Sequence, residues 1–121
     1  MIDRKTQTPE SVAAELKANP PKMPLLDKAA VNYSVNLSNS GGYYELNWSA
    51  DVIQKYDWIG LYPNDTVPDK AYATGDNWQW AVNGSPYKTD TPVSSKHQAR
   101  YVVWDYANGV YVAVAVSNIL G

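Results

Sequence analysis

The run Asp-Trp-Ile-Gly-Leu-Tyr, which begins at Asp57, constrains the fold of this chain more than any other stretch. Successive side chains of an extended strand point to opposite faces, so Ile59 and Leu61 share one face. Trp58 and Tyr62 share the other face, and the glycine between them leaves room for a neighbouring ring or backbone. Because both faces carry large apolar side chains, the run is predicted to be a central strand that packs on both sides.

Other stretches show the two-residue alternation that is typical of half-buried strands. The strands predicted from this alternation lie at 29–38, 43–50, 56–62, 77–82, 99–106 and 110–116, with a polar connection at 86–96. Gly-Gly after the first strand and Asn-Gly before the last one are turn signals that predict hairpins. Short strands with tight turns and no interior helix predict an all-β fold, an antiparallel immunoglobulin or fibronectin III-like β-sandwich.

A short N-terminal α-helix is predicted ahead of the sandwich. Thr8 suits the capping position and Pro9 the first helical position, and an apolar stripe then runs to about residue 19. A helix of about ten residues is too short to be stable alone, so we expect it to dock on its own sandwich or on another subunit. A proline-rich linker follows. The chain is therefore divided into the helix and linker at 1–28 and the β-sandwich domain at 29–121.

Composition and charge exclude several classes of partner. The formal net charge is −2 and the basic residues are scattered, which gives no footprint for nucleic acid. The absence of cysteine excludes disulfides and thiolate metal sites. No stretch approaches the roughly 18 apolar residues of a membrane span. The start of the chain lacks a signal-peptide pattern, and several glycosylation sequons fall inside predicted strands, so we expect a cytoplasmic or non-classically secreted protein.

Catalysis has little support in the sequence. The one histidine, His97, lies in a polar approach to a strand, where we expect it to be solvated, and no nucleophile pattern accompanies it. Two aspartates across a cleft can hydrolyse a glycoside, but aspartates at strand ends are also ordinary turn residues. Their spacing matches no calcium loop. We therefore expect a protein that is not an enzyme and that has no cofactor or metal.

The aromatic residues predict a binding surface. All are Trp or Tyr, none is Phe, and all lie after residue 32, so every large ring carries an N–H or O–H group. A sugar offers an apolar C–H face and a rim of hydroxyls, which a ring beside an Asp or Asn side chain can bind. The candidate ligand-binding residues, near the long loop at 63–76 and the last turn, are Tyr72, Asp76, Asn77, Trp78, Trp80, Tyr87, Trp104, Asp105, Tyr106 and Asn108. The alternative is that the rings fill the core and the polar residues form turns.

Two resemblances to known families accompany these patterns. The run Asp-Trp-Ile-Gly-Leu-Tyr resembles a strand of SKICH domains and of the non-catalytic N-terminal domain of purple acid phosphatases, which implies an immunoglobulin-like sandwich. A capped helix ahead of a cysteine-free sandwich, with the sequence Val-Asn-Gly-Ser from Val82, is similar to the fungal immunomodulatory proteins. Those are lectin-like dimers that exchange the helix, so this resemblance implies a homodimer through the N-terminal helix.

Three functions are compatible with these observations. The first is a non-catalytic, carbohydrate-binding (lectin-like) module that binds a glycan or glycoprotein through tryptophan rings, some of which face solvent. The second is a protein–protein interaction sandwich of the SKICH type, which would offer an edge strand or an aromatic face to a polypeptide. The third is a small hydrolase that uses a pair of carboxylates.

Overall fold

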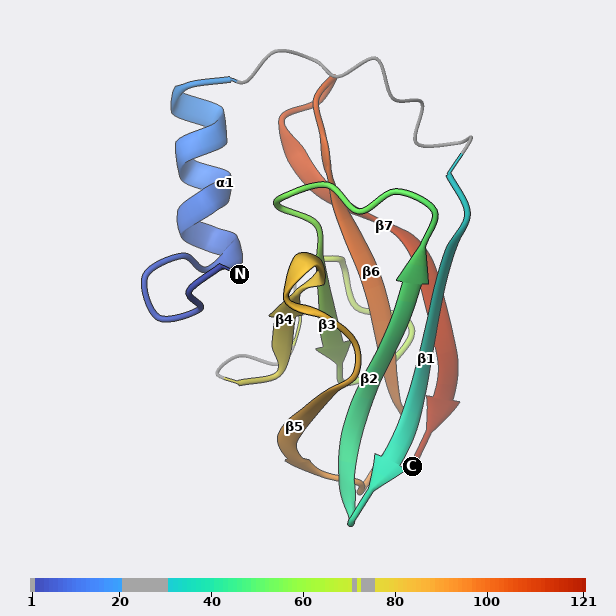
Figure 1. Ribbon diagram of the computed structural model, residues 1–121. Coiled ribbons are helices and arrows are strands. Elements are labelled where there is room, and N and C mark those ends of the chain that lie inside the picture. The colour runs from blue at the N-terminus through green and yellow to red at the C-terminus, as the bar shows by residue number, and fades with distance from the viewer. Residues whose placement is uncertain (1, 21–30, 71, 73–75) are drawn as a thin grey trace.

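The structure is a computed structural model that describes residues 2–20, 31–70, 72 and 76–121. Two antiparallel sheets form a β-sandwich, which confirms the predicted fold class (Figure 1). The strands are β1 (Tyr33–Ser40), β2 (Tyr43–Ala50), β3 (Trp58–Tyr62), β4 (Trp78–Trp80), β5 (Tyr87–Pro92), β6 (His97–Asp105) and β7 (Val110–Leu120). One sheet has the order β1-β2-β5 and the other β4-β3-β6-β7. The fourth strand therefore lies beside the third, unlike that of a constant-type immunoglobulin domain.

Both predicted hairpins form around glycines with positive φ angles. β1 and β2 pair along their whole length, and Gly41 and Gly42 between them have φ values of 60° and 93°. β6 and β7 are joined by a turn that ends at Gly109, where φ is 65°. Residues with a Cβ atom rarely adopt such angles, so glycine at these positions lets the chain reverse without strain.

The polar connection predicted at 86–96 is wrong, because this segment contains β5. Its register places Lys88 opposite Glu45 on β2. The inward residue is Thr89, which is 3% exposed and donates its hydroxyl to the Tyr44 carbonyl oxygen at 2.9 Å. A strand whose buried side chain is a hydroxyl gives no apolar alternation, and backbone pairing at the sheet edge determines its conformation instead. The predicted strand at 77–82 is also shorter, since a 3₁₀ turn, η2 (Ala81–Asn83), follows β4.

β3 separates two hydrophobic clusters, as its alternation predicts. Ile59 and Leu61 are fully buried between the two sheets. Trp58 and Tyr62 pack on the opposite face of the β4-β3-β6-β7 sheet, in a second cluster that we call the outer cluster. The other buried members of the outer cluster are Ile2, Val12, Tyr72, Trp78, Trp80 and Val102. β3 is therefore buried on both faces, as a central strand is.

The helix α1 (Pro9–Ala18) covers the outer cluster of its own sandwich (Figure 1). The predicted cap is confirmed, because the Ser11 backbone N–H donates to the Thr8 hydroxyl at 3.2 Å and the Thr8 N–H donates to the Ser11 hydroxyl at 2.9 Å. Val12 is 1% exposed and anchors the helix in the outer cluster. Among the described residues, no helix combines the length and the apolar character needed to span a membrane.

Hydrogen bonds tie the segment before α1 to the sandwich. The Ile2 N–H donates to Asn83 Oδ1 at 2.7 Å, and Asn83 Nδ2 donates to the Ile2 carbonyl oxygen at 2.9 Å. The indole N–H of Trp80 donates to the Gln7 carbonyl oxygen at 3.0 Å. The helix was predicted to dock on its own sandwich or on another subunit, and in this structure it docks on its own sandwich. The homodimer formed through the N-terminal helix stays a prediction. The linker after residue 20, and with it the boundary between 1–28 and 29–121, lies largely outside the described residues.

Gly60 gives the first mutational prediction. A Cβ atom added at Gly60 would lie 2.6 Å from Trp58 Cζ3, 3.2 Å from Tyr62 Cε1 and 3.2 Å from Tyr72 Cβ. Because packed rings cannot all yield, Gly60→Ala is expected to lower the free energy of unfolding by about 1–3 kcal/mol. Urea unfolding followed by circular dichroism measures this change. The exposed change Ser34→Ala on β1 is the control, and equal stability of the two variants would contradict the close packing described here.

Candidate functional site

The tryptophans are more deeply buried than the sequence suggests. Their exposed fractions run from 0 to 7%, so the expectation that some indole faces are open to solvent is wrong. The outer cluster explains this difference, because the N-terminal segment covers rings that alternation alone leaves on the outside of a sheet. A ligand that contacts the indoles therefore has to enter a recess between the rings. Eight of the ten predicted ligand residues lie at three places in the structure, and the other two, Asn77 and Trp80, have structural contacts.

At the first place, predicted ligand residues surround the side chain of Arg4 from the N-terminal segment. The Arg4 guanidinium carbon lies 4.8 Å from the ring centroids of both Trp78 and Tyr87, and Arg4 Nη1 is 3.6 Å from Asp76 Oδ1. The Tyr87 hydroxyl donates to the Asp76 carbonyl oxygen at 2.8 Å, and burial raises the pKa of this tyrosine. These three predicted residues already hold a cation from the N-terminal segment, and their contact with an external ligand stays a prediction.

Two further predicted residues have structural contacts. Trp80 is fully enclosed, and its ring packs edge-on against Trp78 with centroids 5.1 Å apart. Asn77 is 8% exposed; its side-chain oxygen accepts a hydrogen bond from the Thr91 hydroxyl and its backbone oxygen accepts one from the Leu61 N–H at 2.9 Å. These contacts match the alternative in which the rings and amides stabilise the sandwich.

The second place is the turn between β6 and β7. The Asp105 carboxylate accepts the Ala107 backbone N–H at 3.0 Å and the Asn108 side-chain amide at 2.8 Å. Both residues are thus turn formers, as the alternative interpretation states. Tyr106 is half-buried beside them, and burial raises its pKa. Together with Trp104, Tyr106 and Asn108 line a hollow between this turn and the end of α1.

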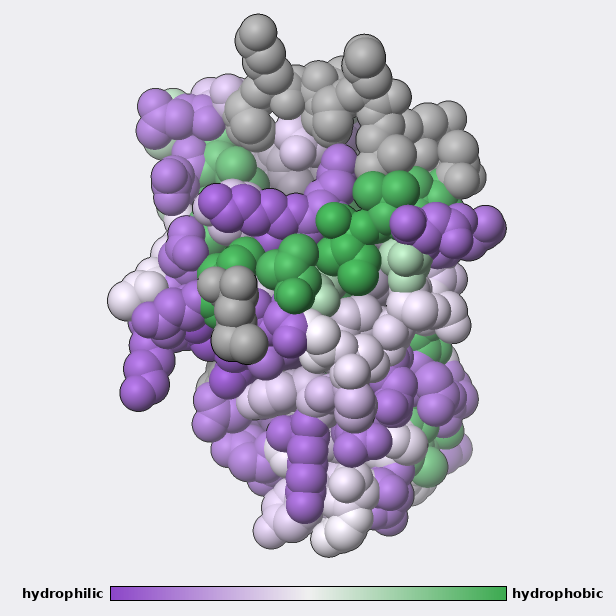
Figure 2. Space-filling view, viewed as in Figure 1, coloured by the Kyte–Doolittle hydropathy of each residue, from purple (hydrophilic) through white to green (hydrophobic). Residues whose placement is uncertain are grey.

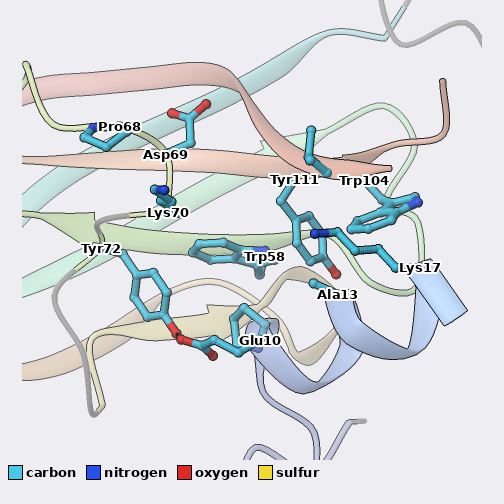
Figure 3. Close-up of a pocket in the computed structure, with 12 residues that line it drawn as sticks. Glu10, Ala13, Lys17, Trp58, Pro68, Asp69, Lys70, Tyr72, Trp104 and Tyr111 are labelled. Atoms are coloured by element: carbon cyan, nitrogen blue, oxygen red, sulfur yellow. Dashed lines mark hydrogen bonds between the residues drawn. The ribbon is translucent and has the colours of Figure 1, made fainter. Parts of the chain in front are cut away.

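The third place is a pocket of about 370 Å³ between α1 and the β4-β3-β6-β7 sheet, shown in Figure 3. We call it the aromatic pocket, because Trp58, Tyr72, Trp104 and Tyr111 line it in a connected row. The ring centroids of Trp58 lie 4.9 Å from Tyr72 and 5.8 Å from Tyr111, and Trp104 lies 5.1 Å from Tyr111. The remaining lining residues are Pro9, Glu10, Ala13, Lys17, Pro68, Asp69, Lys70 and Val110. Only Tyr72 and Trp104 belong to the predicted set.

The loop after β3 forms one wall of the aromatic pocket, and a buried arginine holds this loop in place. Arg100 is 4% exposed, and its Nη1 donates to the Val67 carbonyl oxygen at 2.7 Å and to Asp69 Oδ1 at 3.0 Å. Its Nη2 donates to the Asn64 carbonyl oxygen at 3.3 Å, while the guanidinium carbon lies 4.1 Å from the Tyr62 ring centroid. Three hydrogen bonds from Arg100 therefore hold the long loop at 63–76 next to its contribution to the pocket.

The tyrosine hydroxyls of the pocket are used within the protein. The Tyr72 hydroxyl donates to the Glu10 carboxylate, and the Tyr111 hydroxyl donates to the Tyr56 carbonyl oxygen at 2.9 Å. Burial is the main cause that raises the pKa of Tyr72, with the Glu10 hydrogen bond second, and burial also raises the pKa of Tyr111. Both hydroxyls therefore stay protonated at neutral pH, and they present their rings to the pocket as neutral surfaces.

His97, expected to be solvated, is instead 8% exposed, with its Nδ1 2.8 Å from the Ser95 carbonyl oxygen and its ring 4.5 Å from that of Tyr44. It is not among the residues that line the aromatic pocket. Among the described residues, no group of three or more acidic or histidine side chains is placed to hold a metal ion.

The sequence does not predict the aromatic pocket as a whole, because its lining residues are far apart along the chain. Its rings come from β3, the following loop and the β6–β7 hairpin, so the predicted clusters include Tyr72 and Trp104 but leave out Trp58 and Tyr111. The outward face of the β3 run, which carries Trp58, was the available signal. No protein-family model matches the chain, and no curated protein or solved structure matches it either. The chain is therefore assigned to no family, and the resemblances to SKICH domains and fungal immunomodulatory proteins stay predictions.

Proposed function

We propose that this protein is a non-catalytic binding module that holds a sugar ring in the aromatic pocket. The observation that carries the proposal is the row of four rings, Trp58, Tyr72, Trp104 and Tyr111, around a concave space of about 370 Å³. Small-ligand sites are concave and mostly apolar, with a few polar groups that fix orientation. The C–H face of a pyranose suits such rings, and the charged side chains at the rim suit its hydroxyls.

A pair of neighbouring alanines on α1 provides the test. Ala13 lines the pocket, whereas Ala14 is exposed and is not among its lining residues. Ala13→Phe is expected to fill the pocket and to weaken sugar binding at least about tenfold, which corresponds to about 1.4 kcal/mol. Ala14→Phe adds the same side chain one position along the helix and is expected to leave affinity unchanged.

A glycan array identifies the sugar, and quenching of tryptophan fluorescence by that sugar measures the affinity. Thermal unfolding of both variants shows whether each remains folded, so that a loss of binding is not confused with a loss of structure. The proposal fails if the wild-type protein binds no glycan, or if both phenylalanine variants bind the sugar as tightly as the wild type does.

The second candidate function, a protein-interaction sandwich, is favoured by an exposed apolar band. Figure 2 shows hydrophobic surface across the region of η2 and of the loop between β2 and β3. The exposed apolar residues of these segments are Val52 (43%), Ile53 (39%) and Val82 (41%). Exposed apolar patches of this kind mark protein contacts in many domains. This candidate would be favoured by a polypeptide that binds the wild-type protein but not the Ile53→Asp variant. Free sugar should not displace that polypeptide.

The predicted homodimer remains part of the proposal. The contacts that seat the N-terminal segment, such as Val12 in the outer cluster, would be the same if the segment came from a second copy. Solution mass with and without residues 1–19 distinguishes the two arrangements. A fall from dimer to monomer on truncation supports exchange of the helix, and a monomeric full-length chain argues against it.

A further inference from the structure

The acceptor groups of the aromatic pocket are already used within the protein. Asp69 Oδ1 accepts from Arg100 at 3.0 Å, and Asp69 Oδ2 accepts from the Ala113 backbone N–H at 2.9 Å. The other carboxylate of the pocket, Glu10, accepts from the Tyr72 hydroxyl. A neutral sugar needs acceptors for its hydroxyl protons as well as donors, and these two carboxylates have part of their accepting capacity taken.

The donor groups of the pocket are not used in this way. Lys17 on α1 and Lys70 on the loop after β3 line the pocket from different walls, and Figure 3 shows the Lys17 side chain reaching from the helix toward Tyr111. Within the described part of the chain, neither ammonium group forms a hydrogen bond or an ion pair. The two lysines balance the two carboxylates of the lining in formal charge, and Arg100, which pairs with Asp69 behind the wall, leaves this region with one excess positive charge. The chain as a whole, by contrast, has a net charge of −2.

The indole N–H of Trp58 is a third donor at the same place. Trp58 is 2% exposed and lines the pocket, and its Nε1 has no hydrogen-bond partner among the described residues. Buried donors of folded proteins are nearly always paired, so an unpaired one requires an explanation. This nitrogen is buried, so a ligand acceptor in the pocket reaches it only when the side chains around it move.

We infer that the ligand of the aromatic pocket is a carboxylate-bearing sugar, such as a uronic acid residue at the end of a glycan. This inference rests on the proposed function and specifies its substrate class. The pyranose ring lies against the four aromatic rings, and the carboxylate pairs with Lys17 and Lys70. Charge-assisted hydrogen bonds are stronger than neutral ones, and exposed charges are screened by salt, so affinity for this ligand falls as ionic strength rises.

Matched ligands and matched variants test the inference. The ligands are a glucuronate-terminated and a glucose-terminated oligosaccharide of the same length, with phenylacetate as a carboxylate that carries no sugar. The wild-type protein is expected to bind the glucuronate ligand at least about tenfold more tightly than the glucose ligand at low ionic strength. The double variant Lys17→Gln and Lys70→Gln is expected to remove this preference. Lys96→Gln, an exposed lysine outside the pocket, is the control and keeps it.

The outcomes separate this inference from the proposed function. Equal binding of the two oligosaccharides, or a preference that survives in the double variant, overturns the acidic-sugar inference and leaves the sugar site in place. Binding of phenylacetate without any sugar, or no binding at all, overturns the proposed function and the inference with it. A preference for glucuronate that disappears in the double variant and at high salt, and is kept by Lys96→Gln, supports both.

Discussion

Replacing Trp80 by alanine is expected to lower the free energy of unfolding by about 3–5 kcal/mol. Trp80 is fully buried in the outer cluster, with its ring centroid 5.1 Å from Trp78 and 5.8 Å from Tyr56. Its indole N–H also donates to the Gln7 carbonyl oxygen at 3.0 Å. The substitution therefore leaves a large cavity and an unpaired carbonyl at the contact between the sheet and the N-terminal segment.

Urea unfolding followed by circular dichroism measures the effect of Trp80→Ala. Tyr43→Ala on the other sheet is the control, because Tyr43 is 38% exposed and its loss removes little packing. Trp80→Phe removes the hydrogen bond to Gln7 but keeps a six-membered ring in the cluster, so the difference between Trp80→Phe and Trp80→Ala reports the packing of that ring. A loss below about 1 kcal/mol in Trp80→Ala would contradict the role of this indole as an anchor, because buried large-to-small changes of this kind cost more.

Replacing Arg100 by methionine is expected to lower the free energy of unfolding by about 1–3 kcal/mol, the range for buried polar groups that lose their hydrogen-bond partner. The carboxylate left behind, Asp69, has 35% of its side chain exposed and is solvated there, so the loss of the ion pair itself contributes little. The substitution also leaves the Val67 and Asn64 carbonyl oxygens without their guanidinium donor. The loop after β3 is then free to leave the wall of the aromatic pocket.

Two measurements check the Arg100 prediction. Urea unfolding gives the change in stability, and ligand quenching of tryptophan fluorescence shows whether the pocket survives in the folded variant. Lys70→Met on the same loop is the stability control, because this lysine is exposed and forms no ion pair within the described residues. If Arg100→Met proved as stable as Lys70→Met, the arginine would not be the residue that fixes the loop.

The parts of the fold that depend on local pattern were predictable. The cap at Thr8 and the alternation around Gly60 each specify their own conformation, and the structure confirms both. β5 was not predictable in this way, because Thr89 supplies its only buried side chain and the strand is defined by pairing with β2. Local sequence shows periodicity, whereas an edge strand of polar residues is stabilised by a partner that is distant in sequence.

The candidate site could be predicted only in part, for a related reason. Tyr72 and Trp104 were found because aromatic residues cluster around them in the sequence, and both line the aromatic pocket. Trp78 clusters there too, but in the structure its ring contacts Arg4 from the N-terminal segment. Lys17 and Tyr111 were missed, because only the docking of α1 on the sheet brings them to one cavity. The contacts made by the N-terminal segment thus decide which rings are buried beneath it and which line a space.

The long reach of the N-terminal contacts has a consequence for the order of folding. Ile2 meets Asn83 across 81 positions and Gln7 meets Trp80 across 73. During translation the helix is made well before the strand that receives it, and a helix of this length is not stable by itself in water. Contacts between distant residues form late, because a long loop must close first. The N-terminal segment is thus synthesised before the strands that receive it, yet it is among the last parts to reach its native position.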